Sequence, residues 1–130
     1  MSPRKGLPAA DANRVAADLL PLTPLALSIL IALTETNLHG YGIARRIADR
    51  DAGGVRLAPG NLYAALDRLI AAGLVEPVPA RAAGKREGRR REYRITPFGR
   101  DVARLEAGRL QDLVRTARRL ALLPSTRRTS

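Results

Sequence analysis

One face of the segment from Pro59 to Ala72 combines an amide, a phenol and a guanidinium, which can all form hydrogen bonds with a nucleic acid. Leucine recurs there at helical spacing, which predicts an amphipathic helix with an outward polar face. On that face, Asn61 offers the donor and acceptor that match adenine, and Arg68 offers the fork that matches guanine. Small side chains would let this helix approach a groove wall closely. The expected outward residues are Gly60, Asn61, Tyr63, Ala64, Asp67 and Arg68.

Tyr63 follows the turn-forming pair Pro59 and Gly60 near the start of this predicted helix. The free N–H groups at a helix N-terminus favour phosphate binding. A tyrosine hydroxyl at this end can reach a phosphate oxygen without adding charge. Two interpretations remain open: either Tyr63 contacts a nucleic-acid backbone, or its ring only packs over the base of the hairpin that follows.

A basic loop connects two short predicted strands, at 74–78 and 91–96. The second strand alternates apolar and polar side chains, so the two are expected to form a hairpin. Such a hairpin can bring its cations to a phosphate backbone or a minor groove. The alternative is a solvated loop in an arginine-rich chain. The cations of the loop are Arg81, Lys85, Arg86, Arg89 and Arg90, against one acid, Glu87, and Arg91 follows at the start of the second strand.

The whole chain of 130 residues is strongly basic, because 23 lysines and arginines against 12 acids give a formal charge of +11. A domain of this charge is expected to bind a polyanion. The alternative is the arginine bias of a GC-rich genome, since only Lys5 and Lys85 are lysines. The position of the cations favours nucleic acid. They concentrate in the basic loop and on the outer face of a helix at 41–51, which carries Arg45 and Arg46.

Chemistry other than binding has few candidate residues. The chain has no cysteine and one histidine, His39, without a cluster of carboxylates beside it. This excludes thiolate metal sites and leaves a serine nucleophile with no other base. We therefore expect no enzyme activity, no metal and no cofactor, and a structural role for His39 in a turn. The longest apolar run, at 25–33, is too short to cross a bilayer, so we expect a cytoplasmic protein.

Helices and a hairpin are expected to position these side chains. Asp11 can cap the first helix, and Thr23 can cap the second, with Pro24 at its first position. The second helix is apolar nearly all round, which predicts burial on several sides. The polar stretch that follows it, at 36–40, is expected to be a turn. The expected helices span 11–20, 24–36, 41–51, 59–72 and 97–122, with strands at 74–78 and 91–96.

The fold class expected from this order is mainly α with a small β-hairpin: a winged helix-turn-helix followed by a C-terminal dimerisation helix. The last helix is longer than one small domain needs, and its apolar residues follow coiled-coil spacing. An apolar face of the first helix is expected to pack against it. The expected dimer interface is Val15, Leu19, Leu110, Leu113, Ala117 and Leu120. The expected divisions are a flexible tail at 1–10, the DNA-binding domain at 11–96, the dimerisation helix at 97–122 and a flexible tail at 123–130.

Three blocks of the sequence together resemble the PadR family of transcriptional regulators. They are "HGYGIARRI", "LAPGNLYAALDRLIAAGLVE" and "GRRREYRITPFGR", in that order, within residues 22–122. The resemblance implies a winged helix-turn-helix homodimer that binds duplex DNA and represses transcription from an inverted repeat. It also implies that Tyr41 fills the core between the helices at 41–51 and 59–72. The single C-terminal helix is similar to that of the smaller subgroup, whose members often regulate efflux-pump or stress genes.

The sequence departs from the family pattern at a few positions. Ala58 stands where Ser or Thr usually caps the third helix, and Ala64 stands where proline is frequent. Some family members hold flat drugs between aromatic side chains, but this chain has no tryptophan and one phenylalanine, Phe98. A small-molecule inducer therefore has little aromatic surface to bind. The alternative function is a winged-helix module for protein interaction or RNA binding, although single-stranded RNA binders need several exposed aromatic rings.

Overall fold

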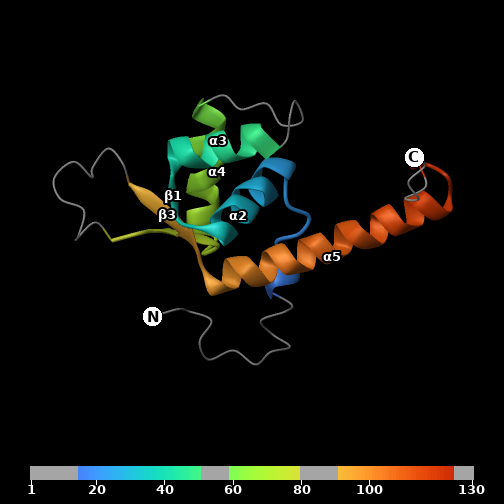
Figure 1. Ribbon diagram of the computed structural model, residues 1–130. Coiled ribbons are helices and arrows are strands. Elements are labelled where there is room, and N and C mark those ends of the chain that lie inside the picture. The colour runs from blue at the N-terminus through green and yellow to red at the C-terminus, as the bar shows by residue number, and fades with distance from the viewer. Residues whose placement is uncertain (1–14, 51–58, 80–90, 125–130) are drawn as a thin grey trace.

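The computed structural model describes residues 15–50, 59–79 and 91–124. Three helices pack around a small sheet, and a long C-terminal helix passes beneath them and extends well beyond the domain (Figure 1). Residues 15–17 are helical and precede the first complete helix. The elements are α2 (Pro24–Glu35), β1 (Leu38–His39), α3 (Gly40–Arg50), α4 (Pro59–Ala71), β2 (Val75–Pro77), β3 (Glu92–Ile95) and α5 (Pro97–Arg119).

Helix α2 lies at the centre of the domain, where it contacts α3, α4, α5 and β3. It begins as the sequence predicts, because the Thr23 side chain accepts a hydrogen bond from the Ala26 N–H at 3.0 Å and Pro24 occupies the first turn. The side-chain oxygen satisfies a donor that the helix itself leaves unpaired. Burial on several sides is confirmed by the core residues Ile29, Leu30, Ala32 and Leu33.

The sheet has three antiparallel strands in the order β1-β3-β2. The predicted hairpin partners are present in shorter form, with Val75 opposite Ile95. The turn expected at 36–40 is wrong in part, because Leu38 and His39 pair with Tyr93 and Glu92 as a third strand. Two residues are too few to show the alternation of a strand. Their pairing depends on the free edge of β3, which lies more than 50 positions away in the sequence.

Helix α4 has the amphipathic pattern that the sequence predicts. Its leucines Leu62, Leu66 and Leu69 are buried in the core. Gly73 adopts a left-handed φ of 81° just beyond the end of α4, a conformation that favours glycine. The chain then enters β2, where the Leu74 carbonyl lies so close to Gly99 that a Cβ on Gly99 would overlap it. This close approach fixes the start of α5 against the sheet.

Helix α5 begins with the same arrangement as α2, since Thr96 accepts from the Gly99 N–H at 2.9 Å and Pro97 follows. It ends at Arg119, three residues before the predicted end, and Ala121 has a left-handed φ of 64°. Phe98 and Val102 anchor its first turns in the core. Within the described ranges, none of the helices has the length and apolar content needed to cross a membrane.

A buried acid, Glu106, joins α5 to the segment that precedes α2. It is 1% exposed, and its carboxylate accepts the Leu22 N–H at 3.1 Å. Arg109 donates to both of its oxygens, from Nε at 2.7 Å and from Nη2 at 2.9 Å. These bonds to Arg109 hold the pKa of Glu106 below its usual range, against the opposing effect of burial. The sequence analysis did not identify this residue.

Candidate nucleic-acid interface

The outward face of α4 is exposed at every position that the sequence analysis assigned to it. The leucines on the opposite face are buried in the core, which fixes the helix and therefore the direction of its exposed side chains. Helix α4 begins at the end of the domain farthest from α5 and runs toward it, so its first turns are clear of the C-terminal helix (Figure 1). The exposed residues are Gly60, Asn61, Tyr63, Ala64, Asp67 and Arg68.

Tyr63 lies against the first residue of α3. A Cβ on Gly40 would overlap the Tyr63 hydroxyl and come within 2.8 Å of its Cζ. The ring is nevertheless 49% exposed. Its packing partner is therefore the start of α3, where a glycine leaves room for the ring. Tyr63 also lies close enough to Tyr93 to raise the pKa of that phenol, although burial is the larger cause.

Tyr41 is 65% exposed, so its expected position in the core between α3 and α4 is wrong. Ile43 and Ile47 define the buried face of α3. Tyr41 lies two residues before Ile43, which is about 200° around a helix, and its ring therefore points outward. Arg45 Nη1 donates to the Tyr41 hydroxyl at 3.3 Å, and the guanidinium lies 5.9 Å from the ring centroid. The hydrogen bond to Tyr41 raises the pKa of Arg45.

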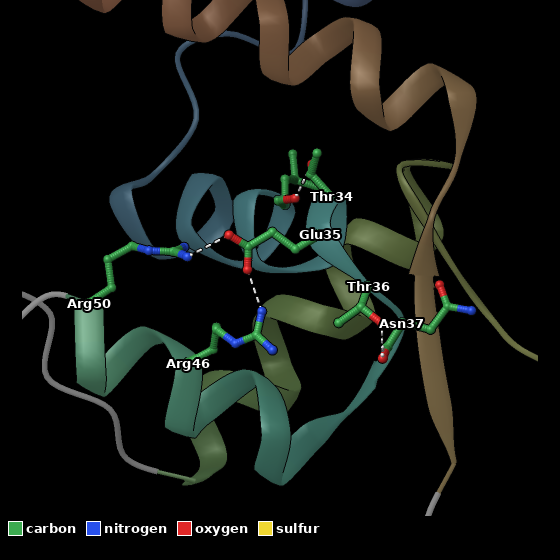
Figure 2. A network of polar contacts seen from close by, with 7 residues as sticks. Thr34, Glu35, Thr36, Asn37, Arg46 and Arg50 are labelled. Carbon is green, nitrogen blue, oxygen red and sulfur yellow. Dashed lines mark hydrogen bonds and ion pairs between the residues drawn. The ribbon is translucent and has the colours of Figure 1, made fainter.

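The remaining arginines of α3 are turned toward α2. Arg46 pairs with one oxygen of Glu35, and Arg50 Nη2 donates to the other at 3.0 Å (Figure 2). Arg46 was expected on the outer face of this helix with Arg45, but it is turned toward Glu35, and its contact with DNA stays a prediction. Its side chain is ion-paired and partly buried, whereas Arg45 forms no ion pair with any described carboxylate. One residue along the helix separates a paired arginine from an unpaired one.

Most of the predicted cations of the hairpin lie outside the described residues, namely Arg81, Lys85, Arg86, Arg89 and Arg90. Arg91 is described, and it is exposed immediately before β3. At the base of the hairpin, Arg94 Nε donates to Glu76 at 2.7 Å across β3 and β2. This pair occupies Arg94, whereas Arg91, just before β3, forms no ion pair with a described acid.

His39 has the structural role that the sequence predicts. Its Nδ1 accepts the Gly42 N–H at 3.2 Å, which satisfies a donor in the first turn of α3. Its ring stacks with that of Tyr41 at 6.5 Å between centroids. Among residues 15–50, 59–79 and 91–124, no group of three or more metal-ligating side chains comes together.

The expected dimer residues lie on surfaces that a second molecule can reach. On α5, Leu113 is 54% and Leu120 is 58% exposed, while Leu110 and Ala117 are half-buried. Val15 is exposed, and Leu19 packs partly on the core. The stripe is wider than the sequence analysis gave, because Leu105 and Val114 are also exposed.

Comparison with known families identifies this arrangement. A family model described as the transcriptional regulator PadR-like family matches residues 29–105, which run from α2 into α5 and make up more than half of the chain. The chain belongs to the PadR-like family. The resemblance stated from the three sequence blocks is confirmed. The predicted fold class is confirmed too: the chain is mainly helical with a small antiparallel sheet, as in this family.

Solved structures agree with this assignment. A PadR family transcription regulator from Clostridium difficile R20291 superposes with a TM-score of 0.63, at 21% identity over 76% of this chain and 99% of that one. The transcriptional regulator BldR from Sulfolobus solfataricus superposes with a TM-score of 0.60, at 26% identity over 90% of this chain and 74% of that one. The chain is therefore similar to transcriptional regulators over its helices and sheet.

A relative in sequence comes from Streptomyces fradiae. It is described as an uncharacterized 37.1 kDa protein in transposon TN4556, and it is 42% identical over 79 residues. The match covers 61% of this chain but 21% of that protein. The chain thus corresponds to about a fifth of the length of this relative.

Proposed function

We propose that this PadR-like regulator is a homodimeric, sequence-specific repressor that binds an inverted repeat in duplex DNA. The observation that carries the proposal is the outward face of α4, where Asn61 and Arg68 are exposed above a buried row of leucines. In a helix-turn-helix protein, such a helix enters the major groove. The side chains on its outer face then meet the edges of the bases.

Base recognition is assigned to Asn61 and Arg68. An asparagine amide pairs with adenine and an arginine fork with guanine, and each good pair contributes about 1–3 kcal/mol of discrimination. The exposed small residues Gly60 and Ala64 allow α4 to approach the groove closely. Arg68 is exposed and forms no ion pair with a described acid, which supports its assignment to a base.

Backbone contacts are assigned to the residues around α4. Tyr63 is exposed on α4 and Arg45 on α3, and Arg91 leads into β3. The proposal extends to the hairpin cations Lys85, Arg86, Arg89 and Arg90, on their charge alone. Such contacts set orientation and affinity without adding sequence information. Arg46 is a weaker candidate, because a phosphate must compete with Glu35 for its guanidinium.

Dimerisation is assigned to α5 and to Val15 and Leu19. The exposed apolar stripe on α5 supports this, since contiguous apolar patches on a protein surface mark interaction sites. A two-fold axis between two such helices would give two α4 helices in opposite orientation. This arrangement matches an inverted repeat with half-sites one helical turn apart.

The proposal includes the position of the operator relative to the regulated genes. We propose that the operator lies upstream of the protein's own gene, and beside a neighbouring transporter or stress gene. A small-molecule inducer is left open, because aromatic surface for one is scarce. RNA binding is the competing function, and the exposure of Tyr41 as well as Tyr63 adds a second ring that could stack on a base.

Capture of genomic fragments by the purified full-length protein, followed by sequencing, tests the proposed function. The expected result is a small number of enriched sites that share an inverted repeat, one of them upstream of the protein's own gene. Capture of transcripts is carried out in parallel. Enrichment of single-stranded RNA without enriched duplex sites would overturn the proposal in favour of the RNA-binding alternative.

A further inference from the structure

The pair formed by Tyr41 and Arg45 has the properties of a small anion site. Tyr41 is 65% exposed on the first turn of α3, and the guanidinium of Arg45 lies over its ring. Neither side chain contributes to the core. The long side chain of Arg45 lies over the ring of Tyr41 instead of extending into solvent. The two residues therefore hold each other in place on an open surface.

The hydrogen bond between them determines what the pair can bind. Arg45 has donors only, so at 3.3 Å its Nη1–H donates and the Tyr41 oxygen accepts. The hydroxyl proton of Tyr41 must then point to another acceptor. The guanidinium keeps further N–H groups that no described acid occupies. The pair thus presents several donors and one positive charge, which matches an ionised phosphate oxygen.

Neighbouring arginines on the same helix provide the contrast. Arg46 and Arg50 each bind an oxygen of Glu35, so their charge is already compensated (Figure 2). Asp49 lies one turn beyond Arg45 and raises its pKa, but it forms no ion pair with it. Among the described residues, Arg45 is accordingly the arginine of α3 whose donors are not taken by an acid.

We infer that Tyr41 and Arg45 together bind a phosphodiester group of duplex DNA at the start of α3. The inference rests on the proposed function, because it assigns a second contact to the same interface. Tyr63 of α4 packs on Gly40, so the first turn of α3, which also carries Tyr41, meets α4 at that tyrosine. With α4 in the major groove, the start of α3 meets the flanking backbone, as the first helix of a helix-turn-helix does.

Fluorescence anisotropy with a mixed-sequence duplex of about 24 base pairs tests this inference across a series of salt concentrations. Tyr41→Phe keeps the ring and removes the hydroxyl, and the expected result is a loss of affinity of about five- to tenfold with an unchanged salt slope. Arg45→Ala is expected to weaken binding and to reduce the slope by ~0.9, because one phosphate is no longer neutralised. The double variant should lose less than the product of the two single losses, since both act on one phosphate.

Arg115→Ala is the control, because Arg115 is an exposed arginine of α5, outside the candidate interface, and pairs with Asp112. It is expected to change affinity less than twofold. Tyr41→Phe with unchanged affinity, or multiplicative losses in the double variant, would overturn the inference. If the wild type, Arg115→Ala and Tyr41→Phe all bind duplex DNA with equal affinity, only this inference fails, and the proposed function stands. If the wild type binds no duplex, the proposed function fails with it.

Discussion

The Tyr63 ring lies against Gly40, so α4 meets the start of α3 through a tyrosine packed on a glycine. The contact brings together the two helices whose exposed side chains are assigned to DNA. It also explains a glycine in α3 by space alone, since any larger side chain there must displace the ring. The relative positions of Tyr41 and the outward face of α4 depend on it.

Gly40→Ala is therefore expected to lower both stability and DNA affinity. The added Cβ overlaps the Tyr63 hydroxyl and ring. Overpacking of this kind costs about 1–3 kcal/mol, which urea denaturation measures. Gly60→Ala is the control for stability alone, because nothing lies within 4 Å of a Cβ at that position. A Gly40→Ala protein as stable as Gly60→Ala would show that the Tyr63 contact is not specific.

Tyr63 is expected to contribute to binding through its hydroxyl as well as its ring. Tyr63→Phe should keep the fold and lose about tenfold in affinity on every duplex, because a hydrogen bond to a charged acceptor is worth ~1.5–3 kcal/mol and a phosphate carries no base information. Titrations alongside thermal melts measure both effects. Unchanged affinity for Tyr63→Phe, with a lower melting temperature for Tyr63→Ala, would leave Tyr63 a packing residue only.

Glu106 is expected to make the fold sensitive to acid. Its pKa is lower in the folded protein than in the unfolded chain. The ionised carboxylate therefore adds stability above the unfolded-state value of about 4.3, and this stability is lost as the pH falls through the lower folded pKa. Glu106→Gln should lose about 1–3 kcal/mol at neutral pH and flatten the acid limb of a stability profile.

Asp112→Asn is the matched control for Glu106, because Asp112 forms an exposed pair with Arg115 at the same spacing on α5. An exposed pair contributes at most about 1 kcal/mol. Equal losses for the two variants in denaturation at neutral pH would contradict the role assigned to the buried carboxylate.

The exposed stripe on α5 is expected to hold a dimer together. Leu113→Glu places a charge on a leucine that is 54% exposed in one chain, and burial of an unpaired charge at an interface is costly. Light scattering at micromolar concentration should give a dimer for the wild type and a monomer for Leu113→Glu. Gln111→Glu, at an exposed polar position two residues away, should remain dimeric. A monomeric wild type would contradict the symmetric repressor.

Local sequence signals predicted the helices well because their causes are local. Thr23 followed by Pro24 fixes the start of α2, and the leucine spacing fixes the buried face of α4. The errors concern residues whose environment comes from distant parts of the chain. The strand at Leu38 exists only because β3 offers an edge to pair with.

The same distinction between local and distant causes holds for the candidate site. The outward face of α4 follows from helical spacing, but the pairing of Arg46 with Glu35 requires two helices to pack at one angle. The family resemblance implied a core position for Tyr41, but its spacing from the buried Ile43 turns its ring outward. Glu106 gave no signal, since the Leu22 N–H that it accepts lies 84 positions earlier in the sequence.

The central claim is that α4 recognises sequence through its outward polar face. The most direct measurement compares Asn61→Ala and Arg68→Ala with wild type on the enriched operator and on a random duplex of equal length. Each variant is expected to lose about 1–3 kcal/mol of binding free energy on the operator, because one base contact per half-site is removed. Its affinity for random DNA should change little. Equal losses on operator and random duplex, or no loss on either, would contradict the central claim.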